Sequence, residues 1–312
     1  MRRLVSGLAL ACAVSVAWAG PASACGTCGC SVNLSEVGAL GSGTNLYQRT
    51  SRFLLQQDVA YRSVNGSFND GGALRGIPVD SSVQALQATF GLAYYATPEL
   101  LFGIQAPVVG NAYSGAAPSS FGTVELREAT SQAAGLGDLA LQVAYRAIAG
   151  DGPIPALGLW LGVLAPSGRA TGVDAEVTGA GVWNGQAGFT ATGASGDLSY
   201  EASLGYQRPF GTPSGVATNF FIGDAVVAQG TLGYQLDPVW KAGVTLSGYR
   251  GLAPLSGGSS ITMSNLKVIP ALTYAFSPDH ALRLGVGFTP GYVAYNALSD
   301  LSCYVTFFQY ID

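Results

Sequence analysis

The stretch Leu198-Ser199-Tyr200-Glu201-Ala202-Ser203-Leu204-Gly205-Tyr206-Gln207 decides the fold, because its residues alternate between two kinds. The even-numbered residues are apolar or aromatic, and the odd-numbered ones are small or polar. A period of two is typical of a β-strand with one apolar face. The same alternation recurs over 136–149 and 282–289, so we predict an all-β protein.

The composition indicates which class of β-protein this is. Only 10% of the 312 residues are charged and 48% are hydrophobic, whereas about 25% of an average soluble domain is charged. Aromatic residues are too plentiful for a disordered chain. Beyond residue 20, no apolar run is long enough for a membrane-spanning helix. We therefore predict a transmembrane antiparallel β-barrel in the cell outer membrane, in contact with its lipid.

Short and long connections alternate along the chain. The short ones are rich in turn-forming residues and are Thr97-Pro98-Glu99, 150–153, 195–197, Asp237-Pro238 and 277–280. The long ones are polar or glycine-rich and lie near 65–81, 111–135, 167–181, 211–222, 251–264 and 291–300. Five short and six long connections predict an up-and-down barrel of twelve strands. Both termini are then expected in the periplasm, where such barrels keep their short turns.

The barrel is expected to occupy residues 52–312. Its predicted strands are 52–64, 82–96, 100–110, 136–149, 155–165, 182–194, 198–210, 223–236, 239–250, 265–276, 281–290 and 301–311. Many glycines fall on the predicted inward face, which favours a passage over a filled barrel; they include Gly91, Gly103, Gly205, Gly233, Gly243, Gly285 and Gly287.

Aromatic residues gather near the short turns. They are Tyr94, Tyr95, Tyr145, Tyr200, Tyr234, Trp240, Tyr274 and Phe276, and they predict a girdle at one membrane interface. The last predicted strand is also aromatic, which suggests recognition by the barrel-assembly machinery. Its final residue, Asp312, departs from the aromatic residue that usually ends such strands.

The N-terminus is expected to be a signal peptide over residues 1–24. Arg2 and Arg3 form a positive start, an apolar stretch follows, and Ala22-Ser23-Ala24 is a small-residue cleavage site. Its removal would leave a chain more acidic than the net charge of −4 of the whole sequence, which argues against nucleic acid as a partner. Residues 25–51 are then expected to form a periplasmic segment.

Four cysteines remain after the signal peptide: Cys25, Cys28, Cys30 and Cys303. The first three could form a disulfide in an oxidising compartment, with Cys303 as a further partner. Three thiolates within six residues could instead bind one copper or zinc ion, although no second CxxC completes a zinc site. Lipid attachment at Cys25, directly after the cleavage site, is a third interpretation. Beyond this possible metal, the sequence indicates no cofactor.

Seven charged residues are predicted to face the lumen: Asp58, Arg62, Arg146, Glu201, Lys241, Lys267 and Arg283. Five are basic and two acidic, so the lumen is expected to be positive although the chain is acidic. They would tune a hydrated passage toward anions or electron-rich small molecules. The alternative is a network of paired charges that fills a structural barrel.

Catalysis is not indicated by the sequence. The single histidine, His280, follows Asp279 in a predicted turn, and no nucleophile with a neighbouring base is visible. We therefore predict that the protein is not an enzyme.

Several segments resemble one family of outer-membrane channels. Gly135-Leu136-Gly137-Asp138-Leu139, followed by Val143-Ala144-Tyr145-Arg146, is similar to a recurrent stretch of the family named for the meta-cleavage pathway of phenol degradation. Residues 159–168 resemble its strand and loop entry, with Ala165 and Ser167 as departures, and residues 90–107 fit its hairpin. The resemblance spans most of residues 80–290.

This resemblance implies an outer-membrane channel or transporter for small solutes, often aromatic or hydrophobic ones. The cysteine cluster departs from the family's pattern and leaves a second hypothesis, a metal-binding scaffold whose barrel is an anchor. An adhesin or receptor acting through the long loops is a third.

Overall fold

The computed structural model describes residues 52–68, 74–76, 82–116, 128–150, 154–168, 179, 182–210, 224–252, 264–290 and 298–312. The predicted signal peptide and the cluster of Cys25, Cys28 and Cys30 lie outside these residues. None of the described residues belongs to a helix that is long and apolar enough to cross a membrane.

The described residues form β-strands that follow one another along the chain. The strands are β1 Phe53–Phe68, β2 Leu74–Gly76, β3 Ser82–Tyr95, β4 Leu100–Ala116, β5 Glu128–Leu136, β6 Leu139–Ile148, β7 Ala156–Ala165, β8 Trp183–Ser195, β9 Leu198–Phe210, β10 Ala225–Gln235, β11 Trp240–Gly251, β12 Ser264–Ser277, β13 His280–Phe288 and β14 Leu298–Ile311.

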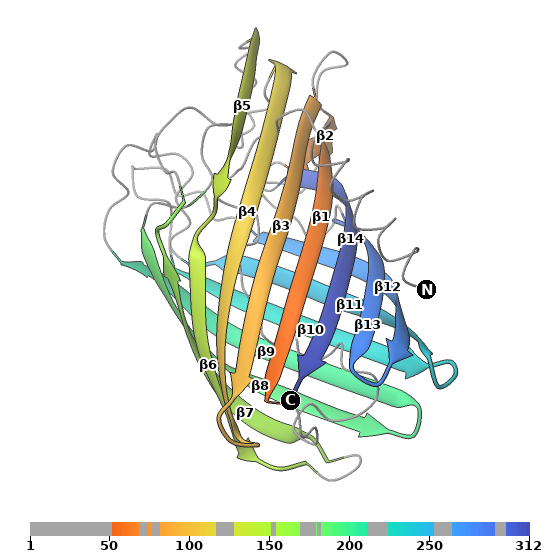
Figure 1. The fold of residues 1–312 in the computed structure, drawn as a ribbon. Helices are drawn as coiled ribbons and strands as arrows, with labels where there is room; N and C mark the ends of the chain where they lie inside the picture. The colour runs from red at the N-terminus through yellow and green to blue at the C-terminus, as the bar shows by residue number, and fades with distance from the viewer. Residues whose placement is uncertain are drawn as a thin grey trace.

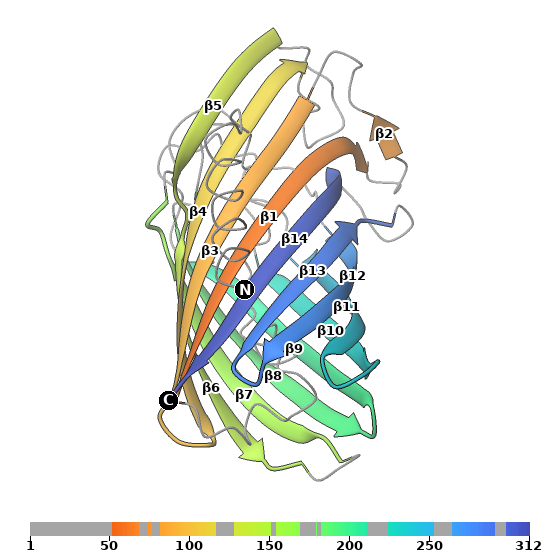
Figure 2. The ribbon, with the colours of Figure 1, turned by 45° about the vertical axis from the view of Figure 1, so that its right-hand side comes forward.

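These strands make a closed antiparallel barrel (Figure 1). Strands that follow one another pair side by side, and β14 pairs with β1, which closes the sheet (Figure 2). Both β5 and β6 pair with β4 and occupy one place in the wall, while β2 pairs only with the end of β1. The wall therefore has twelve strand places, and the predicted all-β barrel of twelve antiparallel strands is confirmed.

The long connection predicted over 111–135 is partly wrong, and strands also extend into those predicted near 65–81 and 291–300. Residues 111–135 are largely strand, because β4 continues to Ala116 and pairs there with β5. This β4–β5 hairpin rises above the neighbouring strands in Figure 1. Its sequence is rich in small and polar residues and has no apolar alternation. Alternation marks the part of a strand that meets lipid, so it does not reveal this extension.

Three short turns are stabilised in the same way, by a side-chain oxygen of the residue that directly precedes a proline. Thr97 Oγ1 accepts hydrogen bonds from the backbone N–H groups of Glu99 and Leu100, at 3.2 and 3.1 Å. Asp237 Oδ1 accepts two such bonds at 2.8 Å, and Ser277 Oγ accepts one at 3.3 Å. These bonds satisfy backbone N–H groups that have no partner strand within the turn. Their acceptors belong to the turn's own residues, which explains why the turns could be predicted from the local sequence.

A fourth turn depends on Gly196, whose φ of 57° is strained for other residues. It joins β8 to β9 and lies at the same end of the barrel as the three turns before proline. We call the end of the barrel that carries these four turns the short-turn end, and we call the opposite end the long-connection end.

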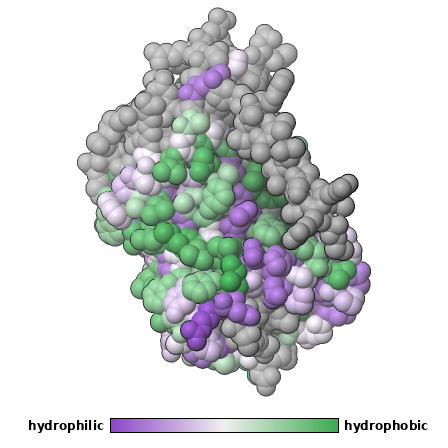
Figure 3. Space-filling view, viewed as in Figure 1, coloured by the Kyte–Doolittle hydropathy of each residue, from purple (hydrophilic) through white to green (hydrophobic). Residues whose placement is uncertain are grey.

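The outward face is apolar, as the alternation predicted. Leu161, Phe189 and Leu204 are each more than half exposed in the isolated chain. Figure 3 shows a broad patch of hydrophobic side chains across one side of the barrel, with hydrophilic ones mainly below and beside it. Such a surface is compatible with a lipid environment and not with water.

Aromatic rings meet on this outward face near the short-turn end. The ring centroids of Trp240 and Tyr274 are 4.6 Å apart, and Phe276 stacks on Phe307 at 6.0 Å. These rings lie where the girdle is expected, with one correction, and its position at a membrane interface stays a prediction. Tyr95 turns inward and packs against the buried cluster described below, because it shares the inward face of β3 with Ala93.

Three of the predicted inward glycines, Gly205, Gly233 and Gly287, do not leave the open wall that the sequence suggested. A Cβ on Gly188 would lie 2.7 Å from the indole of Trp160, and a Cβ on Gly205 would collide with the same ring. In the same way, the side chain of Lys241 lies over Gly233, and the ring of Tyr304 lies over Gly287. These glycines make room for large inward side chains that lie flat along the wall.

Gly205→Ala is therefore expected to destabilise the barrel by about 1–3 kcal/mol, the usual cost of overpacking, because the added methyl group displaces Trp160. The matched control is Gly162→Ala, where the new Cβ meets nothing closer than 3.6 Å. Urea unfolding in lipid vesicles, followed by tryptophan fluorescence, measures the difference. Equal stability of the two variants would contradict this packing.

Candidate functional site in the barrel lumen

The lumen near the short-turn end contains a packed apolar cluster. It consists of Leu54, Ala93, Leu101, Ala281, Phe308 and Tyr310, all buried, with Tyr95, Ala144 and Ala275 packed against it. These residues come from the inward faces of strands on both sides of the β14–β1 junction. The cluster fills part of this end of the barrel and forms the floor beneath the charged residues.

Directly above this floor, one row of charged and hydroxyl side chains crosses five strands. Lys241 on β11 is opposite Thr273 on β12, which is opposite Arg283 on β13. Arg283 is opposite Thr306 on β14, and Thr306 is opposite Asp58 on β1. We call these five residues the charged row. Cations and a carboxylate alternate in it with hydroxyl groups.

A second row, which we call the hydroxyl row, crosses β9, β10 and β11. Glu201 is opposite Thr231, and Thr231 is opposite Thr245. The two threonine hydroxyls lie 3.0 Å apart, and the guanidinium of Arg283 donates a 2.8 Å hydrogen bond to Thr245 Oγ1. This bond connects the hydroxyl row to the charged row.

Both rows are held in place at their ends. Glu201, Lys241 and Arg283 are each more than nine-tenths buried. Asp58 accepts hydrogen bonds from the side chains of Gln56 and Thr306. Lys241 is attracted to Glu201 and repelled by Arg283. Hydrogen bonds and the attraction to Glu201 are stronger in a low-dielectric interior than in water, so they hold the rows together as a polar band.

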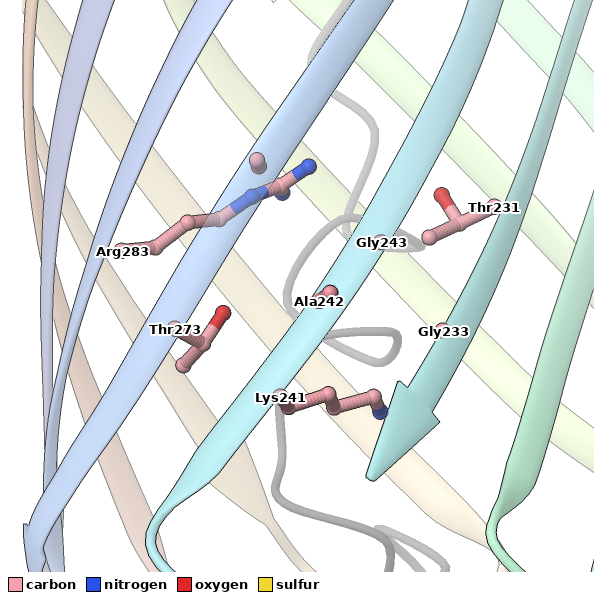
Figure 4. Close-up of a pocket in the computed structure, with 8 residues that line it drawn as sticks. Thr231, Gly233, Lys241, Ala242, Gly243, Thr273 and Arg283 are labelled. Atoms are coloured by element: carbon pink, nitrogen blue, oxygen red, sulfur yellow. The ribbon is translucent and has the colours of Figure 1, made fainter. Parts of the chain in front are cut away.

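An open recess lies between the two cations. It holds about 250 Å³ of empty space, part of it open to solvent, and is lined by Thr231, Gly233, Lys241, Ala242, Gly243, Ala271, Thr273 and Arg283. In Figure 4 the side chains of Lys241 and Arg283 extend in the same direction on either side of Thr273. Because Lys241 lies flat over Gly233, its ammonium group stays at the rim of the recess.

The other predicted cations lie elsewhere. Lys267 Nζ donates to Ser302 Oγ at 2.9 Å and to the Tyr304 hydroxyl at 3.2 Å, closer to the long-connection end. Arg62 is opposite the same Ser302. Arg146 forms an ion pair of 3.6 Å with Glu99, which follows the Thr97-Pro98 turn.

The seven residues predicted to face the lumen thus separate into three places. Asp58, Glu201, Lys241 and Arg283 share the polar band, Arg62 and Lys267 flank Ser302, and Arg146 lies at the short-turn mouth. Their role in selectivity stays a prediction.

Neutral polar residues of the lumen were missed when only charge was considered. The buried set includes Gln56, Gln105, Gln142, Gln186, Gln229, Thr245, Thr273, Ser302 and Thr306. Trp160 is 3% exposed, and its Nε1 has no hydrogen-bond partner among the residues that the structure describes. All these residues occupy alternate positions on predicted strands, so the period of two was sufficient to find them.

The Gly137-Asp138 segment, part of the motif noted in the sequence, separates β5 from β6 and is held in place by hydrogen bonds. Ser167 Oγ donates to the carbonyl oxygen of Gly137 and accepts from the N–H of Leu139, both at 2.8 Å. Asp138 is buried, and its carboxylate accepts a 3.1 Å bond from the N–H of Gly168. The motif is therefore structural, since it fixes the point where the β4–β5 hairpin leaves the barrel wall.

Ser167→Ala is expected to lower the free energy of unfolding by about 1–3 kcal/mol, because it leaves two backbone groups without their side-chain partner. Ser167→Thr, which keeps the hydroxyl, should retain most of the stability. Chemical denaturation in vesicles compares the three proteins. A wild-type midpoint for Ser167→Ala would contradict this role.

The described residues contain no metal site. No group of three or more His, Cys, Asp or Glu residues among them could hold an ion. Cys303 lies exposed on the outward face of β14 and has no disulfide partner within the described part of the chain. His280 stacks on Phe276 at 5.9 Å and shares a 2.9 Å hydrogen bond with Ser277, which makes it part of the outer aromatic surface.

Known proteins were compared with this chain. A family model described as "Putative MetA-pathway of phenol degradation" matches residues 66–298. No curated protein sequence matches the chain. The "COG4313 outer membrane channel from Pseudomonas putida F1" is similar in fold, with 14% identity, a TM-score of 0.66, and coverage of 84% of this chain and 96% of that one.

Two further solved structures match less well. The NanC porin has 11% identity and a TM-score of 0.48, with 82% of this chain and 98% of that one covered. The CymD monoaromatic hydrocarbon channel has 12% identity and a TM-score of 0.44, with 88% and 93% covered. The fold of the chain is thus that of a twelve-stranded outer-membrane channel.

Proposed function

The chain belongs to the family described as the putative MetA pathway of phenol degradation, and from this premise we propose that it passes small solutes through its lumen. Solutes with an aromatic or apolar part are the favoured class. The barrel would act in the outer membrane as a channel without chemical turnover.

One observation carries this proposal, the polar band that encloses an open recess. A barrel that served only as an anchor could fill its interior with apolar side chains, as the floor near the short-turn end does. Instead, buried charges and hydroxyls line the next level, and space remains between Lys241 and Arg283. Such groups cost free energy to bury, and in channels they contact passing solutes.

The orientation belongs to the same proposal. Short turns face the periplasm in outer-membrane barrels, so the short-turn end and both termini would lie there. Solutes would enter from the long-connection end, meet Arg62 and Lys267 first, and then reach the polar band. The aromatic last strand supports assembly by the usual machinery.

The metal-binding alternative depends on Cys25, Cys28 and Cys30, which lie outside the described residues. No observation on the described residues favours it over the channel.

Planar-bilayer recording tests the proposal. The folded barrel, verified by its heat-dependent mobility on gels, is expected to give discrete current steps in potassium chloride. Detergent alone and the heat-unfolded protein serve as controls. A folded barrel that stays silent would contradict a channel function.

A further inference from the structure

The recess between Lys241 and Arg283 has a more specific chemistry than a water-filled passage requires. Two cations from β11 and β13 flank the hydroxyl of Thr273 on β12, all in one register row. The hydroxyl of Thr231 lines the same recess. Cationic and hydroxyl donors around one small space are the groups that proteins use to bind carboxylates.

The acidic residues of the band lie at its ends. Asp58 is two strands from Arg283 in the charged row, and Glu201 is two strands from Lys241 across β10. Two cations therefore flank the recess itself, and the carboxylates flank the cations.

Apolar residues adjoin the recess on the side of the short turns. Ala275, Ala281 and Phe308 each follow a member of the charged row by one inward position toward the short-turn end. Inward positions repeat about every 6.6 Å along a strand. Ala271 also lines the recess, one inward position from Thr273 toward the long-connection end. A polar group in the recess would thus have an apolar surface beside it.

From this arrangement we propose that the recess is a binding site for the carboxylate of a small molecule whose remaining part is apolar, such as a single aromatic ring. The carboxylate accepts hydrogen bonds from the ammonium of Lys241 and the hydroxyl of Thr273, and lies beside the guanidinium of Arg283. The recess itself is small and partly open to solvent, so only the carboxylate enters it and the apolar part lies outside, beside Ala275 and Ala281. The inference rests on the channel function proposed above and names its solute class.

Binding of benzoate, compared with benzyl alcohol, tests the proposal. The two probes have the same ring, and only benzoate carries a negative charge. Calorimetry on the full-length barrel in detergent is expected to show saturable benzoate binding and no comparable binding of benzyl alcohol.

Lys241→Gln should weaken benzoate binding roughly tenfold, the effect of one lost charge-assisted hydrogen bond. Thr273→Val should weaken it as well, and it provides a second test if Lys241→Gln does not fold. The matched control is Arg208→Gln, which removes one positive charge from an exposed side chain that faces Asp224 at 4.0 Å. Its benzoate affinity should equal that of the wild type.

Two results would overturn the proposal: equal affinities for benzoate and benzyl alcohol, or equal losses in Lys241→Gln and Arg208→Gln. The same preparation is recorded in planar bilayers with potassium chloride. A conducting barrel that binds no benzoate refutes the carboxylate site and leaves the proposed channel function standing. A silent barrel refutes the proposed channel, whatever its affinity for benzoate.

Discussion

Leu204→Arg is expected to destabilise the barrel by about 2–4 kcal/mol, because a charge on the lipid face at mid-membrane costs that much. Leu204 is the middle residue of β9, faces outward, and is 56% exposed in the isolated chain. The expected result is a lower urea midpoint in lipid vesicles and a smaller folded fraction on heat-dependent gels.

Leu236→Arg is the matched control. Leu236 is also a leucine exposed by 56%, but it follows β10 at the short-turn end. Near the interface the same substitution costs about 1 kcal/mol or less. In water the two variants would behave alike, so equal destabilisation would contradict a lipid-covered middle for the barrel wall.

Phe308→Ala is expected to have the largest effect on stability, a loss of about 3–5 kcal/mol. Phe308 is 1% exposed and belongs to the apolar floor of the lumen with Leu54 and Leu101. Truncation leaves a cavity among strands that meet at the β14–β1 closure. Equilibrium unfolding in vesicles measures the loss.

Its neighbour Phe307 provides the control, since it faces outward and stacks on Phe276 at 6.0 Å. Phe307→Ala loses this ring contact, worth about 0.5–1.5 kcal/mol, while lipid replaces the ring. If Phe308→Ala were no more destabilising than Phe307→Ala, the short-turn end of the lumen would not be a packed floor.

The wall of the barrel was predictable because its determinants are local. Alternation over residues 198–207 identifies both faces of a strand without knowledge of its neighbours. Proline turns such as Asp237-Pro238 contain their own hydrogen-bond acceptors. The strand count therefore followed from the order of turns and loops.

The arrangement inside the barrel was less predictable, because it depends on register. Arg283 and Thr245 are far apart in the sequence, and only the pairing of β11, β12 and β13 brings them within 2.8 Å. For the same reason the sequence alone predicts open wall at Gly205, although Trp160 from β7 covers it across β8.

Chemical modification of a single inward cysteine tests the central claim, passage through the polar band, most directly. Thr273→Cys places a thiol between Lys241 and Arg283, and Leu272→Cys places one on the adjacent outward position. Cys25, Cys28, Cys30 and Cys303 are replaced by serine in both variants. A bulky charged thiol reagent is expected to reduce the single-channel conductance of Thr273→Cys and to leave that of Leu272→Cys unchanged. Unaltered conductance of a Thr273→Cys barrel whose labelling is verified by mass spectrometry would contradict a passage through this band.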